Sequence, residues 1–206
     1  MKFGNQLALA ICLAFAANVS LVAPSSAGLG ADSARINALG SAGKYSEAIP
    51  LAEAMLANME KGPPSKDLAG ALNNLAQLYG EVGRDAEAEP LFKRALALSE
   101  RSLPTNHPDI VRALNNLATN YEKQDRHAES EALTRRALAL YEKVAPESPT
   151  VATLLNNLGQ IVKADGRHND AEPVIKRSLA IREKVLGRDH IDVARSLEQS
   201  RRPLSA

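Results

Sequence analysis

Four histidines could bind a metal ion or transfer a proton near neutral pH, because imidazole titrates in that range. His127 and His168 lie at matching positions of two successive sequence repeats, and His107 and His190 lie at boundaries between repeats. Matching positions on packed helices are at least about 8–10 Å apart, whereas each ligand lies about 2 Å from a zinc ion. The sequence also contains no phosphate-binding glycine loop, zinc-finger spacing or nucleophile elbow. We therefore expect no catalytic centre, no metal and no cofactor, and predict helix-capping roles for His107 and His190.

Pairs of asparagines recur inside a Leu-Asn-Asn-Leu block that begins at Leu72, Leu114 and Leu155. Asparagine is a poor residue for the interior of a helix, so repeated pairs need a compensating role. The amides could donate to and accept from the backbone of a bound peptide. They could equally bond to neighbouring helices and fix the spacing between repeats. Both interpretations remain open, and one asparagine of each pair could serve each purpose.

Basic pairs recur with the same period, at Lys93-Arg94, Arg135-Arg136 and Lys176-Arg177. A glutamate lies four residues before the first residue of each pair, at Glu89, Glu131 and Glu172. This is the favoured orientation for ion pairs on one helix, and it predicts a solvated outer face. The whole chain has 25 Lys+Arg against 24 Asp+Glu. This balance lacks the basic excess typical of proteins that bind nucleic acids or anionic membranes.

The elements that must position these residues are repeated pairs of helices, with a period of about 42 residues. One face of a first helix is predicted by apolar residues spaced i, i+3, i+4 and i+7, at Leu72, Leu75, Ala76 and Tyr79. A second helix has the same spacing, at Ala88, Leu91, Phe92 and Ala95. Gly83 and Gly166, with Asp125 in the matching position, are suited to left-handed turns between the two helices.

This pattern resembles the tetratricopeptide repeat, in its longer kinesin-light-chain-like variety. The resemblance is carried by Leu72, Leu75, Ala76, Tyr79, Gly83, Ala88, Phe92 and Ala95 and their copies one period on. It implies an all-α, right-handed solenoid of helix-turn-helix repeats at about 31–62, 66–105, 108–147 and 149–187. The first repeat has Asp32 and Arg35 where the others have leucine, so we expect its first helix to be short and frayed.

On a helical wheel, the asparagine pair and Gln77 form a polar arc separate from the apolar arc. In the tetratricopeptide family this polar stripe lines the inner surface of the superhelix, where partner peptides dock. The resemblance therefore implies a groove with flanking residues, formed by Asn73, Asn74, Gln77, Arg112, Asn115, Asn116, Thr119, Lys123, Thr153, Asn156, Asn157 and Gln160.

Residues 1–27 are predicted to be a cleaved signal peptide. Lys2 precedes an apolar run from Leu7 to Val22, and small residues follow at Ser25 and Ala27. An uncleaved N-terminal anchor is the alternative, although the apolar run is short for a membrane span. The composition is typical of bacterial export, so we expect a periplasmic or secreted protein. At the other end, residues 188–201 are predicted to form a capping helix, followed by a tail at 202–206.

The function expected from these observations is that of a non-enzymatic interaction scaffold. Such a scaffold would bind a partner protein or peptide in the concave groove. It would bind no nucleic acid, and no membrane beyond the possible N-terminal anchor. The alternative is a structural subunit of a cell-envelope complex or homo-oligomer, assembling through the convex face or the end helices.

Overall fold

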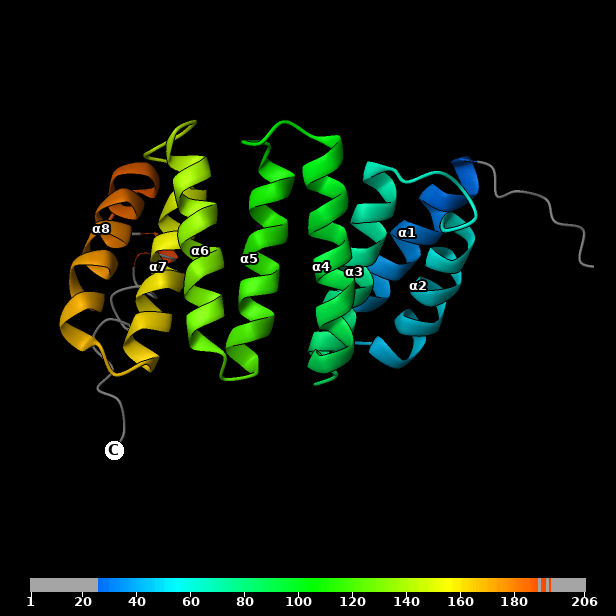
Figure 1. Cartoon of the computed structure of the whole chain (residues 1–206), viewed down its shortest axis with the longest axis horizontal. Helices are drawn as coiled ribbons and strands as arrows, with labels where there is room; N and C mark the ends of the chain where they lie inside the picture. Colours follow the sequence, from blue (N-terminus) through cyan, green and yellow to red (C-terminus); the bar gives the residue numbers. More distant parts are fainter. Residues whose placement is uncertain (1–25, 189, 192, 194–206) are drawn as a thin grey trace, which may run out of the picture.

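The computed structural model describes residues 26–188, 190, 191 and 193. This part of the chain contains eight α-helices and no strand. The helices are α1 (Ser26–Ser41), α2 (Tyr45–Met59), α3 (Lys66–Glu81), α4 (Asp85–Ser102), α5 (Pro108–Lys123), α6 (His127–Glu142), α7 (Pro149–Ala164) and α8 (His168–Leu186). They form antiparallel pairs that stack side by side along one axis (Figure 1). The prediction of an all-α solenoid of helix pairs is confirmed.

A left-handed residue ends the first helix of every pair and lets the chain reverse. The glycines at these turns have φ of 70° at Gly43, 75° at Gly83 and 78° at Gly166. Asp125 takes the same conformation in the third pair, with φ of 56°. The next N–H closes each turn, as where Arg84 N donates to Tyr79 O at 2.9 Å. This is the six-to-one bond of a Schellman motif, and the predicted turn residues are confirmed.

Side-chain caps begin three of the first helices. Ser65 Oγ accepts from the backbone N–H of Leu68 at 3.1 Å, and Ser148 Oγ accepts from that of Val151 at 3.2 Å. Proline occupies the first position of α5 and of α7, where its missing N–H costs no helical hydrogen bond. Further prolines lie inside the second helices α2, α4 and α8, at Pro50, Pro90 and Pro173, and these helices continue through them.

The core is a continuous apolar spine between the helix layers. Leu72 and Leu114 of the first helices are completely buried, as are Ala88 and Ala137 of the second helices. Small residues on the second helices let the pairs pack closely, which holds the first helices side by side. The polar stripe of each first helix is thereby kept on one side of the solenoid.

The first helix pair departs from the others. α1 is as long as α3, α5 and α7, so the prediction that it is short was wrong. Its exposure does differ, because Ile36 is the buried residue among those of α1 whose side chains are described. Asp32 and Arg35 lie on the surface, since a terminal repeat has no preceding neighbour to cover it.

Both predicted terminal segments lie largely outside the described residues. These are the signal peptide at 1–27, and the capping helix and tail at 188–206. Val193 is described within the latter segment, and it is fully buried. In the described part of the chain, no helix combines the length and the apolar character needed to cross a bilayer.

Candidate partner-binding groove

The recurring basic pairs of the second helices form ion pairs with glutamates of the same molecule. The first residue of each pair binds a glutamate four positions earlier, in Lys93–Glu89, Arg135–Glu131 and Lys176–Glu172. The second residue binds a glutamate of the preceding helix pair, in Arg94–Glu60, Arg136–Glu100 and Arg177–Glu142. These pairings match the solvated outer face predicted from the glutamate spacing, and they leave no run of free cations there to follow a phosphate backbone.

Three of the four histidines lie at the starts of α5, α6 and α8. His107 is the N-cap of α5, and its Nδ1 accepts from Asp109 N at 3.2 Å, as predicted. His127 and His168 are the first residues of α6 and α8. Among the described residues, no three His, Cys, Asp or Glu side chains are close enough together to hold a metal ion. The described part of the chain therefore brings no histidines together at a shared site.

An amide ladder connects the first helices. Asn116 Nδ2 donates to Asn73 Oδ1 at 2.9 Å, and Asn157 Nδ2 donates to Asn115 Oδ1 at 2.9 Å. In both cases the second asparagine of one repeat donates to the first asparagine of the preceding repeat. These four side chains therefore brace α3, α5 and α7 against one another.

The ladder ends at the second repeat. The position of α1 that matches Asn73 is Ser33, whose side chain is too short to reach the next helix. Asn74 consequently forms no side-chain hydrogen bond with any described residue, although it matches Asn116 and Asn157. Gln77 lies one turn further along the same face of α3, is exposed, and also has no such partner in the described chain. These two amides are available to a ligand.

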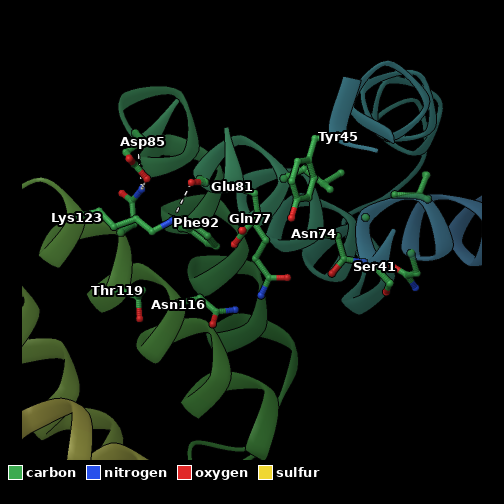
Figure 2. Close-up of a pocket in the computed structure, with 16 residues that line it drawn as sticks. Ser41, Tyr45, Asn74, Gln77, Glu81, Asp85, Phe92, Asn116, Thr119 and Lys123 are labelled. Atoms are coloured by element: carbon green, nitrogen blue, oxygen red, sulfur yellow. Dashed lines mark hydrogen bonds between the residues drawn. The ribbon is translucent and has the colours of Figure 1, made fainter. Parts of the chain in front are cut away.

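A cavity of about 520 Å³ lies where these free amides point. Its wall comes from α1, α3, α4 and α5 and the start of α2 (Figure 2). Amide groups line it at Asn37, Asn74, Gln77, Asn116 and Asn120, and apolar groups line it at Ile36, Leu78 and Phe92. This combination of an apolar floor and several hydrogen-bonding groups is typical of a ligand site.

The cavity includes part of the predicted groove. Five of the predicted residues line it, namely Asn74, Gln77, Asn116, Thr119 and Lys123. Asn73 and Arg112 border a separate small cleft near the start of α5. The remaining predicted residues, Asn115, Thr153, Asn156, Asn157 and Gln160, line neither opening.

Internal hydrogen bonds already occupy several of the predicted residues. Thr119 and Thr153 donate to carbonyls one turn earlier in their own helices, Asn115 O and Pro149 O, each at 3.0 Å. Arg112 pairs with Asp109 at 2.8 Å. Asn156 is buried, and so is the Nε2 atom of Gln160. Thr119, Thr153 and Arg112 thus already have internal partners, whereas Asn156 and the Gln160 amide nitrogen are shielded from solvent by burial.

Sequence reasoning missed the cavity residues contributed by the weakest repeat. Asn37 of α1 matches Gln77 when the turn glycines Gly43 and Gly83 are aligned, and that alignment could have identified it. Tyr45, the first residue of α2, adds a half-exposed aromatic ring. Figure 2 shows it on the same side of the cavity as Asn74 and Ser41.

The charged groups lie at one end of the cavity. Lys123 Nζ donates to Gly80 O at 2.7 Å, which ties the end of α5 to the end of α3. Asp85 accepts at Oδ1 from Asn120 Nδ2 at 3.3 Å, and its backbone carbonyl accepts from the same amide at 3.1 Å. Glu81 forms no ion pair with another described residue. The lining therefore carries two carboxylates and one ammonium group.

Comparison with known families agrees with this architecture. Two tetratricopeptide repeat models match the chain, one over residues 67–143 and the other over residues 151–192. Together they cover more than half of its length. No curated protein sequence matches the chain.

Solved structures of other proteins share this fold. The nearly identical TPR-like repeats of a Podosopora anserina protein assigned as a kinesin light chain align with a TM-score of 0.74 at 22% identity, covering 84% of this chain and 82% of that one. BtubC (BKLC) of P. vanneervenii aligns with a TM-score of 0.73 at 23% identity, covering 84% of this chain and 70% of that one. The resemblance seen in the sequence is confirmed: the chain belongs to the tetratricopeptide repeat family, and its fold is of the kinesin-light-chain-like variety.

Proposed function

We propose that this protein is an interaction scaffold that binds an extended segment of a partner protein in the N-terminal half of its concave face. The site is the cavity lined by α1, α3 and α5. The observation that carries the proposal is the contrast along the asparagine stripe. Asn116 bonds to Asn73, Asn157 bonds to Asn115, and Asn156 is buried, whereas Asn74 has no partner among the described residues and lines the cavity.

An extended peptide suits this site because its backbone alternates donors and acceptors. Each side-chain amide can both donate and accept, so Asn37, Asn74 and Gln77 can pair with consecutive peptide groups without regard to partner sequence. Apolar partner side chains would cover Leu78 and Phe92 at the floor. The helices are already held in place by the ladder and the core, so binding would order mainly the partner segment.

The outer face supports this assignment over assembly through the convex side. Its recurring cations are paired with glutamates of the same or the preceding repeat. A partner docking there would have to compete with ion pairs that are already formed. The tetratricopeptide fold supports a role in protein–protein interaction, and we extend this to a scaffold without catalytic activity.

The location in the cell is also a proposal. We infer export to the periplasm or the medium from Lys2, the apolar run at 7–22 and the small residues at Ser25 and Ala27. N-terminal sequencing of the protein purified from its host checks this. A new N-terminus at Gly28 is expected, and an intact Met1 would contradict cleavage.

Site-specific photo-crosslinking tests the groove. A photo-reactive amino acid at Thr119, an exposed cavity residue, should form adducts with the partner in cells. The matched control places the same group at Ala139, which is exposed on α6 outside the cavity lining. The Thr119 adducts should disappear when Asn74 and Gln77 are both changed to alanine. Adducts that persist in that variant, or that form equally from position 139, would reject the groove.

A further inference from the structure

The last residues of α1, α3 and α5 occupy matching positions in the first three repeats. These residues are Ser41 in α1, Glu81 in α3 and Lys123 in α5. They lie on the cavity side, and all of them line the cavity. The same backbone position therefore carries a hydroxyl, a carboxylate and an ammonium group in successive repeats.

Lys123 shows what this position accomplishes when it carries a cation. Its Nζ donates to Gly80 O, a carbonyl in the last turn of α3. The end of a helix carries partial negative charge, so a cation there is favourable. Asp85 lies on the same side of the helix end, since a Cβ built on Gly80 would be 3.4 Å from Lys123 Nζ and 3.5 Å from Asp85 Oδ1, but the two side chains form no ion pair. The ammonium group thus serves the end of α3.

One repeat earlier the cation is missing. Glu81 occupies the position that matches Lys123 and lines the cavity together with Gly40 and Ser41 at the end of α1, a helix that has no basic residue in its last turn. Gly40 O accepts from Gly43 N at 3.0 Å, but within the described chain it receives no side-chain donor of the kind that Lys123 supplies to Gly80 O. A carboxylate cannot donate to a carbonyl, so Glu81 adds negative charge where its counterpart removes it.

An aromatic ring also lines the cavity, on the side of Ser41 and Asn74 (Figure 2). Tyr45 is the first residue of α2 and so takes the place that Asp85 has in the next repeat. This side chain is partly buried against the core and lines the same cavity as Glu81. A ring face attracts cations, and a planar guanidinium can stack on it while it binds a carboxylate.

We propose that a basic side chain of the bound partner segment, arginine in preference to lysine, fills this position between Glu81, Tyr45 and the end of α1. It restores there the arrangement that Lys123 provides at the end of α3. Asn37, Asn74 and Gln77 hold the backbone of the same segment. This inference rests on the proposed function, and it names the chemistry of the partner.

Binding of defined peptides tests the proposal. The probes are fluorescein-labelled decapeptides of random neutral sequence with one fixed central residue, either arginine, lysine, citrulline, leucine or glutamate. Fluorescence anisotropy with the purified chain should rank arginine first, lysine second and glutamate last. Citrulline keeps the shape of arginine without its charge, and it should bind roughly tenfold more weakly, since the charge-assisted hydrogen bonds are lost.

Two substitutions assign the preference to Glu81. Glu81→Gln should remove most of the difference between arginine and citrulline peptides. Glu81→Lys recreates the residue found at position 123, so it should favour the glutamate peptide and should fold normally by circular dichroism. The control Glu172→Gln removes an exposed carboxylate on α8 and should leave the ranking unchanged.

The outcomes separate this inference from the proposed function. Equal binding of arginine and citrulline peptides, with loss of both in the Asn74→Ala/Gln77→Ala variant, would overturn the basic preference and keep the groove. An arginine preference that survives Glu81→Gln would also overturn it. Absence of binding by every peptide would reject the groove and the basic side chain together.

Discussion

The contrast between Asn74 and Asn116 predicts opposite effects for the same substitution at matching positions. Asn116 Nδ2 donates to Asn73 Oδ1, and Asn73 is only 5% exposed. Asn116→Ala leaves this buried oxygen without its donor, which costs about 1–3 kcal/mol. Alanine recovers about 0.6 kcal/mol through its better helix propensity. We expect a net destabilisation of about 0.4–2.4 kcal/mol from these two effects.

Asn74→Ala removes no hydrogen bond to any described residue. The better helix propensity of alanine should therefore leave stability unchanged or raise it by up to about 0.6 kcal/mol. Partner binding should nevertheless be lost or strongly weakened, because the amide lines the cavity. Stability thus distinguishes the two positions of the same repeated motif, because Asn116→Ala lowers it and Asn74→Ala does not.

Urea denaturation followed by circular dichroism measures the free energy of unfolding of both variants, and thermal denaturation gives their melting temperatures. In a chain of this size, about 1 kcal/mol corresponds to a shift of about 2–4 °C in the melting temperature. The double variant Asn73→Ala/Asn116→Ala supplies the control, since removing both partners should cost less than the sum of the single changes. Equal destabilisation by Asn74→Ala and Asn116→Ala would refute the distinction between bracing and binding amides.

Gly159→Ala should destabilise the protein in urea denaturation, because the new Cβ would lie 2.4 Å from Ile175 Cγ1. Such overpacking costs about 1–3 kcal/mol. Adding Ile175→Ala in a double variant should reduce that cost. Asp125→Gly should raise the melting temperature, because Asp125 has φ of 56° and only glycine adopts this conformation without strain; a lower temperature would contradict this. The hydrogen bond from Lys93 lowers the pKa of Glu89, so its contribution to stability is present above the unfolded-state pKa and is lost as the pH falls through the folded-state pKa. Glu89→Gln should therefore destabilise the protein at pH 7 and have little effect below pH 3, as measured by urea denaturation at both pH values; an equal effect at both would contradict this.

The fold was predictable from the sequence because its determinants are local. The spacing of Leu72, Leu75, Ala76 and Tyr79 defines one face of a helix without knowledge of its neighbours. Turn residues such as Gly83 determine the backbone conformation only of their immediate neighbours. The left-handed conformation of Asp125 could likewise be predicted from its position in the repeat. The error at α1 came from treating Asp32 and Arg35 as helix-shortening residues, although they affect its burial and not its length.

The site was only partly predictable, because it depends on distances between repeats. The sequence places Asn73 and Asn74 on the same polar arc, and it could not say which of them would meet the next helix. That choice follows from the stagger between α3 and α5, which brings Asn116 against Asn73 and leaves Asn74 open.

The sequence by itself determined the helix pairs, their turns and the polar stripe, since each arises from contacts a few residues apart. Tertiary structure alone decided which amides brace the solenoid and which face the cavity. It also decided that Glu81 stands at a helix end where the next repeat has a lysine donor. Packing sets these relations, because residues about 40 positions apart become neighbours only when the repeats stack.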